Sequence, residues 1–493
     1  MRELLRLPSR LIVLFGMVLI RSPEPATAQE LGTECNLQSY RVLSSQVTIQ
    51  GRRVTWVGRP DLVCPNGTRI QADSAVIYEE SGRNELIGRV RFDDPQRELR
   101  SDLADYYEPE GRLLARGSVE FRDLIQGTEI RGDTLVFLEA GGQRAEDHVT
   151  VQGQRPSVTF FPADAPEEDE DGVELEQIPY QVTANRLRFE GERHFWADGD
   201  AEMQRDELRA SADSLWFHRE DGDLALTGEA ELETDEAEFT GGQILVEIPG
   251  DEIRSITVRD RGRLLTQDIE LLGEEIRIRF VDERIQRLVA VHREPSGEGE
   301  GNGRPQPRAI TEDFLLIADS IDVVSPDEQL ETVHAVGRAR AETGTREERE
   351  GAAESADSED MIPERDWIEG DEILAAFQPV VPGDPDVQTS DLPESESDSR
   401  REYRLDRLVA TGSARTLYRS PPDDRGGTPG EPTATDRESW SVSYLLADEI
   451  AIHLLGSAVD RVEAEGNVRG IQLEPSGPRT SSVGAAEEED LEE

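Results

Sequence analysis

The sequence predicts an all-β protein built from repeated antiparallel β-hairpins. Three observations lead to this prediction: a short phrase that recurs along the chain, an alternation of apolar and polar side chains within each copy, and a glycine-containing turn in the middle of each copy. Alternation over about four to eight residues is typical of a strand with one buried face. Two such strands joined by a short turn such as Ser81-Gly82, Glu110-Gly111 or Asp221-Gly222 form a hairpin.

The recurring phrase has two halves. The first reads apolar, any, small, acidic, any, apolar, any, apolar, as in residues 70–77, and the second reads apolar, any, Ala or Gly, any, Gly, any, Val or Ala, as in residues 113–119. Copies without insertions are about 30 residues apart. Self-similarity at a period of roughly 20 to 50 residues indicates an array of units that share one core, so we expect a long face or groove rather than a compact pocket. The small residue of the first half falls at Ala72, Ser101, Gly132, Ala184, Ala212, Gly241, Gly273, Ala318, Gly370 and Ala447.

Two architectures fit such a repeat: an open antiparallel roll with two facing leaves, and a parallel β-solenoid. The turn in the middle of each copy favours the roll, because solenoid coils do not require one. A glycine also recurs in the second strand, as at Gly88, Gly117 and Gly228. Glycine within a strand marks a bend, a bulge or a close backbone approach, so its fixed position predicts a continuous crease along the fold.

The first residues have the layout of a secretory signal. Arg2, Arg6 and Arg10 precede an apolar run at 11–20, and residues 26–28 offer small side chains for cleavage. The apolar run is too short to span a bilayer as a helix, although an uncleaved anchor is an alternative. We therefore expect an exported chain.

The N-terminal region carries Cys35 and Cys64, the two cysteines of the chain. In an exported protein an even number of cysteines favours a disulfide, which would stabilise a cap that precedes the first clear repeat. Two free buried thiols are the alternative.

The expected organisation follows from these repeats and from stretches rich in Pro, Gly, Ser and acidic residues. The segments are a signal peptide at 1–28, a cap at 29–69, β-repeats at 70–161, an acidic insertion at 162–181, β-repeats at 182–294, a Gly/Pro linker at 295–309, divergent β-repeats with acidic insertions at 310–473, and an acidic tail at 474–493.

Charge and motif content argue against several classes of function. The formal net charge is −53 and every basic residue is arginine, which argues against nucleic acid and against anionic membrane surfaces as main partners. The six histidines have no metal-ligand spacing, and no nucleophile elbow or phosphate-binding loop appears. The acid that recurs in each copy is expected to form hydrogen bonds at strand ends, since a catalytic pair would be unique. We expect no enzyme activity and no cofactor.

Several of these phrases resemble the OstA-like family of periplasmic lipopolysaccharide-transport proteins, which includes the LptA bridge protein and the N-terminal domain of LptD. The residues that carry the resemblance are Ala72-Asp73, Leu114-Ala115-Arg116-Gly117-Ser118-Val119 and Ile130-Arg131-Gly132-Asp133. The likeness is clearest over 70–137, weakens over 182–291, and returns at 316–339 and 445–468.

This resemblance implies a V-shaped β-jellyroll in the periplasm whose apolar groove shields the acyl chains of lipopolysaccharide or a similar glycolipid. It also implies edge-to-edge contact with other transport components or with a second copy. The chain is longer than one such domain needs, so two stacked rolls with a seam near 162–180 are an alternative to one. It is also far more acidic than phosphorylated glycolipid head groups would favour.

The predicted function is therefore a non-catalytic lipid-binding bridge or chaperone in lipopolysaccharide transport and outer-membrane assembly. The alternative is a structural β-repeat scaffold or an exported protein-interaction or adhesin module, whose interior would be filled to normal packing density. The residues predicted to line the groove are Ile77, Val136, Phe137, Leu187, Phe189, Leu215, Trp216 and Phe217.

Overall fold

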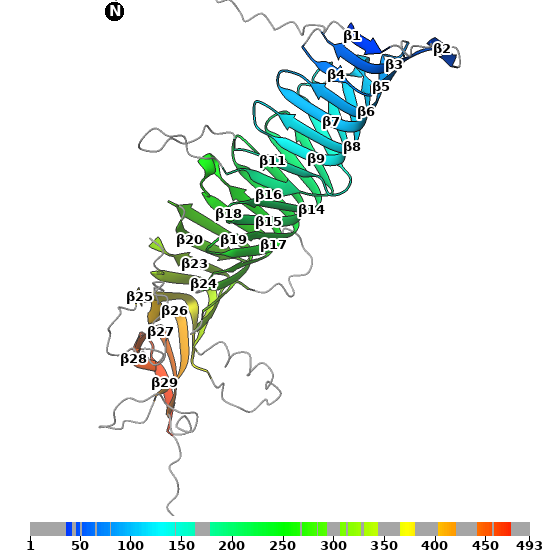
Figure 1. The fold of residues 1–493 in the computed structure, drawn as a ribbon. Coiled ribbons are helices and arrows are strands. Elements are labelled where there is room, and N and C mark those ends of the chain that lie inside the picture. Colours follow the sequence, from blue (N-terminus) through cyan, green and yellow to red (C-terminus); the bar gives the residue numbers. More distant parts are fainter. Residues whose placement is uncertain are drawn as a thin grey trace, which may run out of the picture.

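The chain forms one long antiparallel sheet folded over on itself (Figure 1), and the computed structural model shows strands of the described residues joined in a single ladder. Strands β1 and β3 lie at one end of the elongated stack, and β28 and β29 lie at the other. The structure describes residues 36–41, 46–49, 52–64, 67–78, 80–142, 144–162, 178–266, 269–282, 284–292, 306–311, 314–326, 330–343, 365–379, 403–420, 441–455 and 458–474.

Over the described residues, the elements with defined bounds are strands and the short 3₁₀ turns η1 and η2. In the first third they are β1 (Asn36–Arg41), β2 (Gln46–Ile49), β3 (Arg52–Val63), β4 (Arg69–Gln71), β5 (Ser74–Tyr78), β6 (Arg83–Asp93), β7 (Arg97–Tyr107), η1 (Glu108–Glu110), β8 (Arg112–Asp123), β9 (Glu129–Leu138), β10 (His148–Gln152) and β11 (Ser157–Phe160). In the middle they are β12 (Tyr180–Thr183), β13 (Arg186–Glu190), β14 (His194–Arg205), β15 (Leu208–His218), β16 (Asp223–Glu233), β17 (Glu238–Glu247), η2 (Pro249–Asp251), β18 (Ser255–Leu265), β19 (Glu270–Val281) and β20 (Arg284–Val291). In the last third they are β21 (Arg308–Ile310), β22 (Phe314–Ile317), β23 (Ser320–Val324), β24 (Thr332–Thr343), β25 (Trp367–Pro379), β26 (Tyr403–Ser420), β27 (Ser441–Leu455), β28 (Ala458–Glu465) and β29 (Arg469–Leu473).

Each long strand runs through both layers of the folded sheet and bends at its middle. In the β6–β7 pair, Ile87 faces Leu103 and the pairing resumes only at Val90 and Ser101, so that two residues of β6 bulge out of the ladder. The same register shift recurs in the pairs β14–β15, β16–β17, β24–β25 and β26–β27. A bulge at one position in successive strands bends the sheet along a line, which we call the crease.

The crease divides the sheet into two leaves. Leaf A contains the half-strands on the side of residues 83–87, 214–218 and 223–227, and leaf B contains those on the side of residues 90–93, 208–212 and 230–233. Hairpin turns lie along the free edge of each leaf, on the side opposite the crease, and we call that side the mouth. The predicted all-β fold of antiparallel hairpins is confirmed, and the antiparallel pairing excludes the solenoid.

The described strands form one roll rather than two. Across the acidic insertion, β11 pairs with β12 and β10 pairs with β13, so the ladder has no seam near 162–180. The expected Gly/Pro linker at 295–309 overlaps β21, and both β20 and β21 pair with β19 as the two halves of one crossing. Residues 163–177 and 293–305 of these two segments, the signal peptide and the tail beyond 474 lie outside the described residues.

The repeated acid lies in the crease against a glycine of the next crossing. A Cβ atom on Gly228 would lie 2.8 Å from the Cβ of Asp213, and the φ of +79° at Gly228 is strained for any residue with a side chain. The prediction that these acids form hydrogen bonds at strand ends holds for Asp73 and Asp319, which lie between two short strands and accept hydrogen bonds from Arg89 and Arg338. It is wrong for Asp102 and Asp213, because there one continuous strand carries the bend and the acid lies at mid-strand. The crease pairs are Asp73–Gly88, Asp102–Gly117, Asp133–Gly153, Asn185–Gly199, Asp213–Gly228, Asp319–Gly337, Asp371–Gly412 and Asp448–Gly466.

One crease pair is exchanged. Between β17 and β18, Gly242 takes the place of the acid and Asp260 takes the place of the glycine, with a φ of 61°. A Cβ on Gly242 would lie 2.8 Å from the Cβ of Asp260. Because the space holds one side chain, an acid on either strand requires glycine on the other.

Side-chain size changes with distance from the crease. In β14, Ala197 and Ala201 flank the bulge and are buried, whereas Phe195 and Met203 lie further out on the same inward face. In β8, Ala115 lies beside the bulge on leaf A, and Phe121 lies toward the mouth of leaf B. Small residues near the bend and large ones near the mouth produce a wedge-shaped interior, which agrees with the predicted V.

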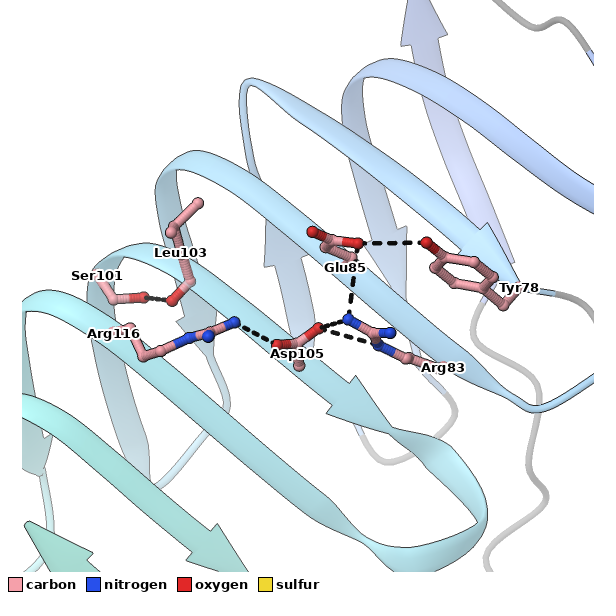
Figure 2. Close-up of polar contacts among 7 residues, drawn as sticks. All are labelled: Tyr78, Arg83, Glu85, Ser101, Leu103, Asp105 and Arg116. Carbon is pink, nitrogen blue, oxygen red and sulfur yellow. Dashed lines mark hydrogen bonds and ion pairs between the residues drawn. The ribbon is translucent and has the colours of Figure 1, made fainter. Parts of the chain in front are cut away.

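The outer face of leaf A carries charged groups. Figure 2 shows the buried carboxylate of Asp105, with Oδ1 2.7 Å from Nη2 of Arg83 and Oδ2 2.5 Å from Nη2 of Arg116. Glu85 lies 3.6 Å from the same Arg83 nitrogen and accepts a hydrogen bond of 3.4 Å from the hydroxyl of Tyr78. The alternation therefore places charge outside and leaves the interior apolar.

The N-terminal cap adds strands to one end of the roll. Asn36 to Arg41 of β1 pair with the second half of β3, and β2 pairs with its first half. Cys64 is disulfide-bonded, and Cys35, its expected partner, lies outside the described residues.

Candidate functional site

A single apolar layer lies between the two leaves. Buried hydrophobic residues form one cluster that extends from Leu62 to Leu454, and many of its members, such as Leu86, Leu226 and Ile321, are fully buried. Both leaves contribute to this cluster, so the interior is continuous along the roll.

The structure places the predicted groove residues on different faces. Leu187, Leu215, Phe217 and Phe189 are buried in the core cluster, and Phe137 is partly buried against it. Ile77 is half-buried on β5. These positions follow the two-residue alternation of their strands.

Val136 and Trp216 lie on the outer face of leaf A. Their neighbours Leu135, Leu215 and Phe217 are buried, so a period of two turns the side chains between them outward. The ring of Trp216 lies 6.3 Å from that of His194, as part of an outer aromatic group that includes His218. An apolar run of three residues thus contributes to both faces of the sheet.

Aromatic rings connect the leaves near the mouth. Phe160 and Tyr180 of leaf B contact Phe217 of leaf A at centroid distances of 5.8 Å and 5.1 Å, and Phe160 lies 5.4 Å from Phe195. Elsewhere Phe92 and Tyr106 meet at 5.7 Å, and Phe314 and Phe377 meet at 5.6 Å. The leaves are therefore in contact through side chains, and no strand pairing among the described residues joins their mouth edges.

A pocket of about 440 Å³ opens at the mouth between the turns of the two leaves, and we call it the mouth pocket. Its apolar wall includes Phe121, Phe137, Val149 and Phe189, and Phe121, Val149 and Phe189 are each 8 % exposed although most of the core is less accessible. Ligand pockets typically have volumes of about 300–1,000 Å³, an apolar lining and a few polar groups. The mouth pocket is thus a place where the interior can be reached from the side.

Two of the arginines at the rim of the pocket are paired with carboxylates. Nη2 of Arg97 lies 2.6 Å from Oδ2 of Asp147 across the mouth, and the guanidinium stacks over Phe137 at 5.1 Å. Nη2 of Arg193 lies 2.8 Å from Oε1 of Glu146. Their charges are therefore compensated within the protein.

Arg219 joins the two leaves at the pocket without a carboxylate. Its guanidinium, on the leaf A side, donates hydrogen bonds to Oε1 of Gln126, to the carbonyl oxygen of Phe161 at 2.8 Å and to the carbonyl oxygen of Glu192 at 3.3 Å. It also lies 5.4 Å from the ring centroid of Phe160. Burial lowers the pKa of Arg219, and the charges of Asp123 and Glu192 oppose this shift only in part.

Two polar atoms at the mouth pocket have no hydrogen-bond partner among the described residues: Nε of Arg219 and Oγ1 of Thr128. Thr128 is 6 % exposed, so water replaces the missing partner poorly. Sequence reasoning did not find these residues, because the bonds of Arg219 span 58 and 93 positions and no local pattern marks them.

The last strands expose apolar side chains at the end of the roll. Among the described residues, β28 and β29 each pair only with β27, so the other edge of both strands is free. Val468, Ile471 and Leu473 are 52 %, 65 % and 53 % exposed. In the described part of the chain, the interior layer therefore ends in exposed apolar side chains.

Another hollow lies away from the mouth pocket. A hollow of about 700 Å³ on the outer face of leaf B has a largely polar lining that includes Thr159, Gln181 and Ser211. No group of three or more His, Cys, Asp or Glu residues in the described ranges is arranged to hold a metal ion. No helix in the same ranges is long and apolar enough to cross a membrane.

Comparison with known proteins gives limited information. No family model and no curated protein matches this chain. Among solved structures, it is similar to LptH from Pseudomonas aeruginosa, described as the LptA-homologous periplasmic component of a conserved lipopolysaccharide transport device. The match has 13 % identity and a TM-score of 0.22, and it covers 27 % of this chain and 82 % of LptH. With a TM-score of 0.22, this likeness adds nothing to the strand pairing and burial described above.

Proposed function

We propose that this protein is a non-catalytic lipid-binding bridge or chaperone of the periplasm that shields the acyl chains of lipopolysaccharide or a similar glycolipid between its two leaves. The observation that carries the proposal is the continuous apolar layer between leaves that are hinged at the crease and that, over the described residues, no strand pairing joins at the mouth. Separating the leaves would break no strand pairing among the described residues.

The energetics favour hydrocarbon in this layer. Each buried methylene group contributes about 0.8 kcal/mol, so a few acyl chains offset the loss of the contacts between the leaves. Charged contacts are not required, which reconciles lipid binding with a net charge of −53.

The free edge at β28 and β29 supports edge-to-edge contact with another transport component or a second copy. Unpaired backbone groups on an edge strand are templates for strand addition, and the exposed side chains of Ile471 and Leu473 would be covered by it. Such contact would extend the apolar layer beyond this chain.

A second function is favoured by one observation. Most inward side chains are fully buried, which is the filled interior expected of a β-repeat scaffold that binds proteins on its surface. The two functions differ in whether lipid ever contacts the inward side chains.

Photocrosslinking separates them. A benzophenone amino acid at the inward positions Phe217 and Phe280 should capture lipid in the envelope of a lipopolysaccharide-producing cell, whereas the same group at the outward Trp216 should not. Lipid adducts from Trp216 alone, or protein adducts from every position, would favour the scaffold. Phe217 and Trp216 are matched, because they are adjacent on β15 and face opposite sides.

A further inference from the structure

We propose that the mouth pocket is a binding site for a single-chain anionic amphiphile, with Arg219 and Thr128 holding the head group and the apolar wall holding the tail. The proposal rests on the proposed function in one respect, since the tail is taken to continue toward the layer between the leaves. The evidence for the binding site itself is the apolar wall of the pocket and the two polar atoms there that have no hydrogen-bond partner among the described residues.

The charge of Arg219 points to an anion. Its guanidinium is held by an amide oxygen and two carbonyl oxygens, and among the described residues it forms no ion pair. A partly buried cation that lacks a counter-ion favours an anionic ligand. The charges of Asp123 and Glu192 act on Arg219 from nearby, but neither carboxylate forms a direct ion pair with it among the described residues, and Oδ1 of Asp123 accepts hydrogen bonds of 2.9 Å from the backbone N–H groups of Ile125 and Gln126.

The free hydrogen-bonding atoms fit the same ligand. Nε of Arg219 and the hydroxyl of Thr128 both line the pocket and can donate to the oxygens of a carboxylate or phosphate. Of the other carboxylates that line the pocket, Asp147 and Glu146 are paired with Arg97 and Arg193, and Glu192 and Glu220 are exposed, so ion pairing and solvent limit their repulsion of an anion.

The tail has an apolar route next to the head group. Phe121, Phe137 and Phe189 form the wall, and Leu124 and Ile125, which come just before the pocket residue Gln126 in the chain, are 53 % and 68 % exposed. These two exposed side chains belong to the same turn as Gln126 and Thr128. An alkyl chain that follows the wall inward from the head group contacts aromatic side chains of both leaves.

Binding of the head group would also release the hydrogen bonds from Arg219 to Gln126 and Phe161 of the other leaf, which we call the latch. Hydrogen bonds to an ionised acceptor are roughly twice as strong as those to neutral oxygens, so an anionic head group displaces Gln126 and the carbonyl oxygens of Phe161 and Glu192 from Arg219. The ligand thereby weakens the contact that closes the mouth at this point.

Titration with a matched pair of probes tests the site. The fluorescent probe 11-(dansylamino)undecanoic acid and its methyl ester share a tail and differ in head-group charge. The full chain should bind the acid at least about tenfold more tightly than the ester, and Arg219→Gln should bring the ratio close to one. Arg209→Gln, which changes an exposed arginine paired with Glu233 outside the mouth pocket, should keep the ratio.

The controls keep the outcome decisive. Arg219→Lys should retain part of the preference for the acid, and the isosteric Thr128→Val should lower it a few-fold without removing the latch. An unchanged ratio in Arg219→Gln, or an equal fall in Arg209→Gln, would overturn the site. Thermal unfolding identifies a variant that fails to fold, in which case Arg219→Lys and Thr128→Val decide. Lipid capture at Phe280, away from the pocket, reports separately on the proposed function.

Discussion

Exchanging the reversed crease pair should stabilise the roll. The double variant Gly242→Asp with Asp260→Gly restores the arrangement found in the other crease pairs, with the acid on the earlier strand and glycine in the bulge. The exchange removes an aspartate from a φ of 61°, which for an L-residue costs about 1–2 kcal/mol relative to a favoured conformation.

Each single change should behave differently from the pair. Gly242→Asp alone puts a second side chain where the new Cβ would lie 2.8 Å from the Cβ of Asp260, and it places two carboxylates together. We expect it to destabilise by about 2 kcal/mol. Asp260→Gly alone relieves the backbone but leaves two facing glycines, whose extra freedom in the unfolded chain costs about 0.5–1 kcal/mol, so its net effect should be close to zero.

Hydrogen exchange measures the effect where it arises. Long repeat arrays need not unfold in one step, so opening free energies of peptides from β17 and β18 are a better readout than a single unfolding midpoint. The double variant should show slower exchange than the unchanged chain, with a coupling of at least about 2 kcal/mol between the two sites. Single effects that simply add, or a double variant that exchanges faster, would refute the account of the crease.

Further predictions concern the cap, the core and a half-buried acid. Cys64→Ser should lower the stability of the N-terminal strands by about 3 kcal/mol, measured as faster hydrogen exchange there, and an unchanged rate would show that the disulfide does not hold the cap. Leu226→Ala removes a fully buried side chain and should cost about 2–5 kcal/mol in β15 to β17; a loss below about 1 kcal/mol would mean that the interior is loosely filled. Burial, with a contribution from the charge of Asp147, raises the pKa of Glu139, so its ionised form is disfavoured in the folded state and the cost disappears as pH falls through the folded pKa. Glu139→Gln should therefore raise the melting temperature at pH 7 and leave it nearly unchanged at pH 4, and an equal rise at both values would contradict this cause.

Much of the fold could be predicted because its determinants are local and repeated. The alternation around Leu215 predicts a strand, and the glycine that recurs as Gly228 predicts a bend that the structure places at the crease, whereas the position of Asp213 against that glycine was not predicted. Repetition adds strength to the signal, since each copy reports on the same position. The exchanged pair at Gly242 and Asp260 could be recognised only once the register of β17 and β18 was known.

The candidate site could be predicted only in part. The alternation shows that Val136 and Phe137 face opposite sides, but it does not show which of them is inward, because both are apolar. Burial of Leu135 decides the question. Arg219 and Thr128 belong to turns from different parts of the chain, and their proximity to one pocket depends on the folding of the two leaves.

The distance between the two leaves tests the central proposal most directly. Spin labels at Asp235, in the turn between β16 and β17 on leaf B, and at Glu252, after η2 on leaf A, report on the width of the mouth. A second pair at Asp221 and Glu252, both on the leaf A edge, provides the control. Addition of lipopolysaccharide should lengthen and broaden the first distance and leave the control distance unchanged. Bound lipopolysaccharide with an unchanged distance across the mouth would contradict lipid binding between the leaves.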